Sequence, residues 1–249
     1  MPEVPFGKSS GRPRWWALVL SRTNGDSVRL YYMTSEHWGS LDLARKRLKF
    51  ARFDDLNDPF ELLSAYLGER SARRFYKKMK AAVHERFGLI CFSDNWRSPV
   101  MWAHYAEKHK GLCLGFDVKE AAEVKYEPER LKHKLDQNAP GVRVAADLTK
   151  IAMTTKYEEW RYEHEWRVFK ELTNQHADGN YYEDFGEFIV LREVIIGARC
   201  NLTSADVAKL VCKVENSVSV IKARPGFTKF EVVEQNLVTP LVLGGGKVT

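Results

Sequence analysis

The sequence predicts a single α+β domain, built on a central, largely antiparallel sheet with helices on its flanks. Short apolar runs that suit strands alternate with amphipathic segments, but without the strict strand–helix–strand order of a parallel sheet. No internal repeat or low-complexity segment divides the chain, and 249 residues are enough to bury one substantial core. We therefore expect one domain at residues 15–240, between a loose arm at residues 1–14 and a flexible tail at residues 241–249.

Local signals place the elements of the first half. Asn24-Gly25 lies between two apolar runs and predicts a hairpin turn, and Ser35 suits the N-cap of a helix. Asn57-Asp58-Pro59 predicts a turn into a further helix. The strands expected here are residues 15–20, 28–33, 48–53, 88–93 and 111–118. The helices expected here are residues 35–47, 69–87 and 98–108.

The second half shows the same mixture of apolar runs and amphipathic segments. A helix is expected at residues 142–160, before a strand that carries an unusual charge pattern, and another helix at residues 204–214. The strands expected here are residues 164–171, 190–196, 219–223 and 230–233.

Composition excludes several classes of protein and permits others. Lys and Arg outnumber Asp and Glu by 39 to 33, a modest excess that permits an anionic partner without requiring one. The four cysteines are widely spaced and form no C-x-x-C pair, which is typical of reduced thiols. No apolar run reaches the length of a membrane span, and the first residues lack a signal-peptide core. We therefore expect a cytoplasmic protein with no membrane partner.

Common catalytic motifs are missing from the sequence. The seven histidines show no H-E-x-x-H spacing, so we expect no metal site. Neither a Walker loop, nor G-x-G-x-x-G, nor G-x-S-x-G occurs, which removes the usual nucleotide-fold and hydrolase signals.

One candidate site lies in Trp160–Arg167. On an extended strand, Glu163, Glu165 and Arg167 share one face. Two carboxylates on one strand face repel each other unless a cation lies between them, and Arg167 is the expected cation. One interpretation is an ion ladder on an edge strand. The other is a catalytic site, in which one carboxylate orients a sugar hydroxyl or acts as a general base.

A second candidate site combines rings with polar groups between residues 91 and 117. Trp102 and Tyr105 are three residues apart on the expected helix, so they are neighbours on its surface. Ser93 ends a strand, where ligand-binding groups commonly occur. Such an aromatic stripe either packs into a core or forms a platform for a flat ligand.

In chain order, several motifs resemble a large, mostly bacterial family described only as domain of unknown function 2971. The resemblance runs from about Leu30 to Gly197. Its motifs are Asn57-Asp58-Pro59-Phe60-Glu61, Cys91-Phe92-Ser93, Met101-Trp102-x-x-Tyr105, Gly115-Phe116-Asp117, Glu163-x-Glu165-Trp166-Arg167 and Glu193-Val194-Ile195-Ile196-Gly197.

The layout also resembles, more distantly, ADP-ribosyltransferases that act on nucleic acid. This resemblance implies a split sheet, NAD as substrate and catalysis by Glu165, with Glu163 orienting or deprotonating the acceptor. It implies that Tyr32, Ser93, Trp102 and Tyr105 bind NAD. Those enzymes carry His or Arg where this chain has Tyr32, which can donate a hydrogen bond but carries no positive charge.

Two other functions stay open. The first is a nuclease or nucleic-acid-binding protein without NAD chemistry, whose contact would be the basic helix at residues 69–87. The second is a sensor that binds a small ligand without catalysis. A third carboxylate beside Glu163 and Glu165 would favour a nuclease. An aromatic-lined cleft that holds Tyr32, Ser93 and Glu165 together would favour the transferase.

Overall fold

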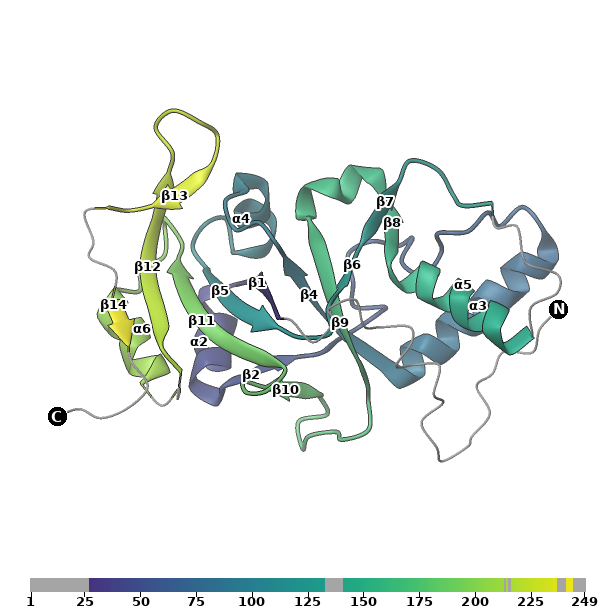
Figure 1. Cartoon of the computed structure of the whole chain (residues 1–249), viewed down its shortest axis with the longest axis horizontal. Helices are drawn as coiled ribbons and strands as arrows, with labels where there is room; N and C mark the ends of the chain where they lie inside the picture. The colour runs from purple at the N-terminus through teal and green to yellow at the C-terminus, as the bar shows by residue number, and fades with distance from the viewer. Residues whose placement is uncertain (1–26, 133–140, 213, 215, 237–240, 244–249) are drawn as a thin grey trace.

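A curled, mixed sheet of ten strands extends from one end of the molecule to its middle, and helices α3 and α5 lie at the other end (Figure 1). The computed structural model describes residues 27–132, 141–212, 214, 216–236 and 241–243, and only the backbone of residues 141–145 and 243. The main path of the sheet is β13 (Val232–Glu234), β12 (Val218–Pro225), β11 (Ile189–Ile196), β5 (Leu112–Val118), β1 (Val28–Thr34), β4 (Phe87–Ser93), β9 (Glu165–Glu171) and β6 (Ala122–Glu123).

Short strands complete this sheet and form two smaller ones. β14 (Leu241–Leu243) pairs with β12, and β3 (Ala51–Arg52) pairs with β4. In the main sheet β11 and β12 are parallel and the other pairs are antiparallel, as predicted. The small sheets pair β2 (Arg47–Lys49) with β10 (Tyr182–Asp184), and β7 (Lys125–Glu127) with β8 (Thr155–Tyr157).

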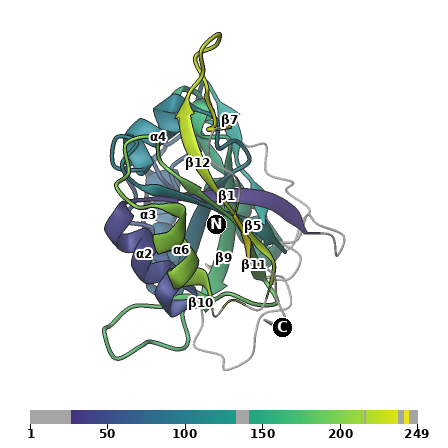
Figure 2. The same ribbon diagram turned by 90° about the vertical axis from the view of Figure 1, so that its left-hand side faces the viewer.

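Helices cover both faces of the sheet and one end of the molecule. α2 (Glu36–Arg45) and α6 (Ser204–Val211) pack on one face, where their apolar side chains join the largest core. α4 (Pro99–Tyr105) lies on the other face (Figure 2). α3 (Arg70–Arg86) and α5 (Gly141–Met153) share a second core beside β4. The structure is therefore the single α+β domain that the sequence predicts.

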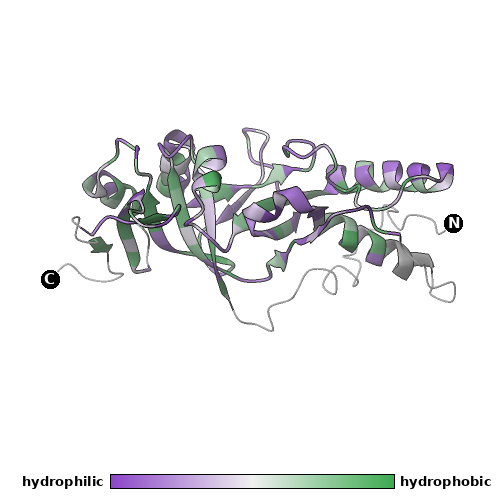
Figure 3. Ribbon diagram, turned by 90° about the horizontal axis from the view of Figure 1, so that it is seen from above, coloured by the Kyte–Doolittle hydropathy of each residue, from purple (hydrophilic) through white to green (hydrophobic). Residues whose placement is uncertain are grey.

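The hydropathy of α3 and α5 explains how they build this end of the molecule. α3 alternates hydrophilic and hydrophobic bands along its length, whereas the coloured part of α5 is mostly hydrophobic (Figure 3). Phe75, Tyr76, Met79 and Val83 form the buried stripe of α3, at the spacing of one helix face.

β1 and β4 separate soon after they meet, and this separation creates the candidate site. Seven residue pairs join β1 to β5, but a single pair, Tyr31 with Ser93, joins β1 to β4. Beyond that pair, β3 takes the free edge of β4, opposite Gly88 and Leu89.

Several predicted boundaries differ from the structure. The strand expected at residues 48–53 is two short strands, β2 and β3, that pair with different partners. The helix expected at residues 142–160 ends at Met153, because the Thr154-Thr155 run leaves the helix and β8 pairs with β7. No helix follows the Asn57–Glu61 turn until α3 begins at Arg70.

Most predictions for the two ends of the chain fall outside the described residues. The arm at residues 1–14 and the strand expected at residues 15–20 lie outside the described residues, as does the Asn24-Gly25 turn. Within the expected tail, Leu241–Leu243 form β14. Across the described part of the chain, no helix combines the length and apolar character needed to cross a bilayer.

Candidate functional site

A cavity of about 300 Å³ opens where β1 and β4 separate. We call it the main cavity. Its volume is at the lower end of the range for small-molecule sites in proteins. The structure brings five of the six residues of the sequence-predicted site to its wall, and these are Tyr32, Ser93, Tyr105, Glu163 and Glu165.

Trp102 is the sixth, and the structure does not bring it to the main cavity. Its side chain is fully buried in a separate apolar cluster, and its indole Nε1 donates to the carbonyl of Trp96 at 2.6 Å. Trp102 therefore anchors α4 in the core, while Tyr105 on the same helix carries the contact with the cavity.

Three adjacent strands align polar side chains at one level of the sheet. Tyr31 on β1 pairs with Ser93 on β4, and Ser93 pairs with Glu165 on β9. Residues paired in this way project to the same face of a sheet. Tyr32 projects to the opposite face, where its ring meets Phe92 edge-on at 6.1 Å, and burial raises the pKa of its hydroxyl. Tyr31, and not the predicted Tyr32, is thus the β1 side chain that lies level with Ser93 and Glu165 on one face of the sheet.

Arg167 is fully buried and holds two carboxylates at once. Its Nη1 and Nη2 donate to the two oxygens of Glu61 at 2.9 and 2.6 Å. Its Nε and Nη2 donate to the two oxygens of Glu165 at 2.8 and 3.0 Å. Another bond, from Nη1, reaches the carbonyl of Met153 at the end of α5. This two-sided fork fixes Glu165 at the beginning of β9.

Lys156 links Glu163 to Glu165, the two carboxylates of the predicted pair. Its Nζ donates to Glu163 at 2.5 Å and to Glu165 at 3.3 Å. Glu163 also accepts a hydrogen bond from the hydroxyl of Tyr105, which accepts in turn from Nδ2 of Asn57 at 2.7 Å. We call Glu61, Lys156, Glu163, Glu165 and Arg167 the charge cluster. All five are buried.

The charge cluster moves the pKa values of its two central carboxylates in opposite directions. Burial opposes ionisation of Glu165, but Arg167 and Lys156 outweigh it and lower the pKa to about 2. For Glu163, burial and the neighbouring charge of Glu165 outweigh Lys156 and raise the pKa. Two carboxyl groups with separated pKa values suit different roles, one as a fixed anion and one as a proton carrier.

The predicted strand face is wrong for Glu163, although Glu163 does line the main cavity. Glu163 ends a 3₁₀ helix, Glu158–Glu163, and His164 adopts the left-handed conformation with φ 48°. This residue ends the 3₁₀ helix and leads into β9, so Glu163 and Glu165 reach Lys156 from different elements. The interpretation as an edge-strand ion ladder is also wrong, because β9 lies between β4 and β6 and the charges are buried.

Arg167 is the cation that the sequence predicts, but four residues of the site were not predicted from the sequence. They are Tyr31, Asn57, Glu61 and Lys156. Asn57 and Glu61 belong to a motif that predicts a turn and carries the family resemblance, and that motif was the available signal. Glu61 is fully buried in the structure. Lys156 gave no such signal, because it lies in a segment expected to be helical.

Glu61 is the third carboxylate that would favour a nuclease. Both of its oxygens accept hydrogen bonds from Arg167, so a guanidinium group occupies the place between Glu61 and Glu165. Among the described residues, no group of three or more His, Cys, Asp or Glu is arranged to hold a metal ion.

Fold and site together define an α+β protein that buries a charge cluster at the wall of a ligand-sized cavity. Residues 101–168 match the model of a family described as a protein of unknown function (DUF2971), which supports the family resemblance that the motifs indicate. The matched segment contains four members of the charge cluster, Lys156, Glu163, Glu165 and Arg167, together with Tyr105. A search of curated proteins and a search of solved structures each found no match.

Proposed function

We propose that this protein transfers ADP-ribose from NAD to an acceptor on a nucleic acid or a protein. The observation that carries the proposal is the alignment of Tyr31, Ser93 and Glu165 on three adjacent strands beside one cavity. The resemblance to ADP-ribosyltransferases places the functional residues on a first strand, a second strand and a late strand. In this chain β1, β4 and β9 are neighbours, and each contributes to the wall of the main cavity.

Glu165 acts on the NAD ribose in this proposal. The bond between ribose C1′ and nicotinamide breaks, nicotinamide leaves with the bonding electron pair, and positive charge develops on the sugar ring. An ionised carboxylate stabilises such a transition state and accepts a hydrogen bond from the ribose 2′-hydroxyl. Arg167 and Lys156 take three acceptor positions of Glu165, and the Cys91 thiol donates weakly to it. The ribose hydroxyl displaces this thiol.

Glu163 and Tyr105 act on the acceptor. An acceptor oxygen or nitrogen attacks C1′, and its proton passes to Glu163. The raised pKa of Glu163 suits this role, since a general base works best when its pKa approaches the working pH. Lys156 and Tyr105 hold the carboxylate in position through one oxygen each.

The direct test uses labelled NAD with Glu165→Gln, beside Glu158→Gln as the control. Glu158 is exposed and pairs with Arg161, so its replacement leaves the charge cluster intact. We expect NAD to raise the melting temperature of the wild type, and we expect Glu165→Gln to lose label transfer by at least 100-fold. A circular-dichroism melt tests whether the variant is folded.

Transfer that persists in folded Glu165→Gln would overturn the role of this residue. If millimolar NAD gives no thermal shift, the proposal fails, and the nuclease and sensor functions are favoured instead. Metal-dependent cleavage of DNA or RNA would then indicate the nuclease, and a shift with another small ligand without turnover would indicate the sensor.

A further inference from the structure

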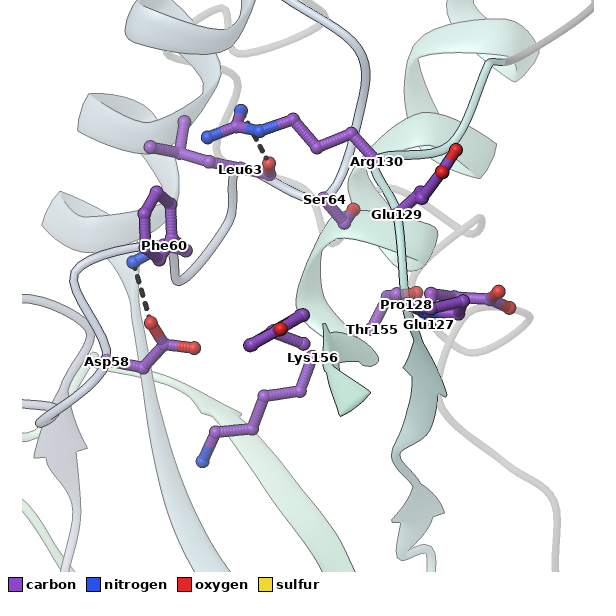
Figure 4. A pocket seen from close by; sticks show the side chains of 11 residues that line it. Asp58, Phe60, Leu63, Ser64, Glu127, Pro128, Glu129, Arg130, Thr155 and Lys156 are labelled. Atoms are coloured by element: carbon purple, nitrogen blue, oxygen red, sulfur yellow. Dashed lines mark hydrogen bonds between the residues drawn. The ribbon is translucent and has the colours of Figure 1, made fainter. Parts of the chain in front are cut away.

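A second cavity, of about 270 Å³, lies beside the charge cluster (Figure 4). Lys156 lines both this cavity and the main cavity, so the two adjoin across one side chain. The proposed transfer reaction gives the second cavity no role. Figure 4 shows Asp58 and Phe60 on one side, Glu127 and Pro128 on the other, and Lys156 between them.

Aromatic and apolar side chains form the walls. Phe60 and Tyr157 line the second cavity and keep 55% and 48% of their surface exposed, although rings of this size are normally covered. The guanidinium of Arg130 lies 5.3 Å from the centre of the Phe60 ring, and its Nη1 donates to the carbonyl of Leu63 at 3.1 Å. Flat surfaces of this kind favour a flat ligand.

Polar groups in the second cavity offer specific contacts. The hydroxyl of Ser64 is buried and has no hydrogen-bond partner within the described part of the chain. An unpaired buried hydroxyl is costly, and a ligand that pairs with it recovers that cost. Asp58 is buried, and its Oδ1 accepts from the amide of Phe60 at 2.8 Å, which leaves acceptor positions on the carboxylate.

The charges around the second cavity disfavour an anionic ligand. Three carboxylates line it, from Asp58, Glu127 and Glu129, against the cations Arg130 and Lys156. The ammonium of Lys156 is already engaged by Glu163 and Glu165. A phosphate would therefore meet a net negative lining.

We propose that the second cavity binds a planar nitrogen heterocycle that carries N–H donors and no phosphate within the pocket. The ring lies against Phe60, its N–H groups donate to Asp58, and Ser64 completes the contact. In the transfer reaction this ring belongs to the acceptor, whose reacting atom then lies near Lys156 and Glu163; that last step alone rests on the proposed function.

Titration calorimetry with adenosine as the probe tests the site in the full chain. Phe60→Ala removes the aromatic wall of the second cavity, and Ser64→Ala removes the unpaired hydroxyl. The matched control is Phe230→Ala, which alters a fully exposed ring that does not line this cavity. We expect wild type and the control to bind adenosine equally. We expect Phe60→Ala and Ser64→Ala to bind at least fivefold more weakly, and AMP to bind wild type more weakly than adenosine.

Each result decides the proposal. Adenosine that fails to bind wild type at millimolar concentration, or that binds Phe60→Ala and Ser64→Ala as well as the control, overturns it. If AMP binds more tightly than adenosine, the inference that the negatively charged lining disfavours a phosphate is overturned. The NAD thermal shift, measured on the same variants, separates this proposal from the proposed function. An unchanged NAD shift with lost adenosine binding supports the second cavity alone.

Discussion

Glu163 and Glu165 show how neighbouring residues of one type acquire different properties from their surroundings. Glu165 receives hydrogen bonds from Arg167 and Lys156, whereas Glu163 receives one charged donor and the hydroxyl of Tyr105. Three carboxylates in the charge cluster face two cations, so one carboxylate lacks a full counter-charge. The raised pKa assigns that deficit to Glu163.

This deficit makes the stability of the protein depend on pH through Glu163. A raised pKa means that the folded state binds the proton more tightly than the unfolded state, whose carboxyl titrates near 4.5. The contribution of Glu163 is therefore fully present below pH 4.5 and is lost as pH rises through the raised pKa. In this range the free energy of unfolding falls by up to about 1.4 kcal/mol per pH unit through Glu163.

Glu163→Gln removes this titration, so we expect its stability relative to wild type to increase from pH 4.5 up to the raised pKa and to stay constant above it. Glu165, whose pKa is lowered, loses its contribution as pH falls from 4.5 towards 2, and both proteins keep that group. Urea unfolding at intervals between pH 4.5 and pH 8 provides the measurement. Parallel stability profiles for the two proteins would contradict the prediction.

At the scale of elements, the junction between the 3₁₀ helix and β9 determines the geometry of the site. His164 has φ 48°, a conformation that glycine and asparagine adopt more readily than other residues and that β-branched residues avoid. Its side chain is half exposed, near Asp94, so a replacement acts mainly through the backbone.

We expect His164→Val to destabilise the protein by about 1–2 kcal/mol, because valine resists the left-handed conformation. His164→Asn and His164→Gly should stay within about 0.5 kcal/mol of wild type. Chemical denaturation of the three variants measures the differences. Equal losses in all three would show that the imidazole, and not the backbone, stabilises this junction.

Elements that depend on local signals were predictable from the sequence, and those that depend on distant partners were not. Ser35 caps α2 as expected, with its hydroxyl accepting from the amide of Trp38. β7 and β8 were missed, because each is three residues long and forms only when the other is present. The separation of β1 from β4 likewise depends on β3, which competes for the same edge.

In the candidate site, too, contacts between residues close in sequence were predictable, and contacts between distant residues were not. The spacing of Glu163, Glu165 and Arg167 predicted that these three charges interact, because they are close in sequence. Glu61 lies 106 residues from Arg167, and no sequence pattern specifies a pairing at that separation. Trp102 shows the reverse problem, since its helical neighbour Tyr105 reaches the cavity while Trp102 turns into the core.

At the scale of the whole molecule, the charge cluster connects the helical end to the central sheet. Glu61 lies before α3, the carbonyl of Met153 ends α5, and Arg167 on β9 binds both. The second core, which contains α3 and α5, packs against β4 beside this connection. α6 and β12 lie at the opposite end of the molecule (Figure 1).

Glu61→Gln should therefore loosen the helical end selectively. Removing one partner of a buried ion pair costs about 3 kcal/mol or more, and this cost falls on the elements that the pair connects. We expect amides of α3 and of residues 146–153 to exchange hydrogen roughly 100-fold faster, with α6 and β12 unchanged, since parts of a domain open independently. Glu193→Gln, which alters a half-exposed pair with Arg29, is the control and should leave α3 unchanged. Faster exchange at both ends would instead mean that the domain opens as one cooperative unit, in which the charge cluster stabilises the whole sheet and not one end of it.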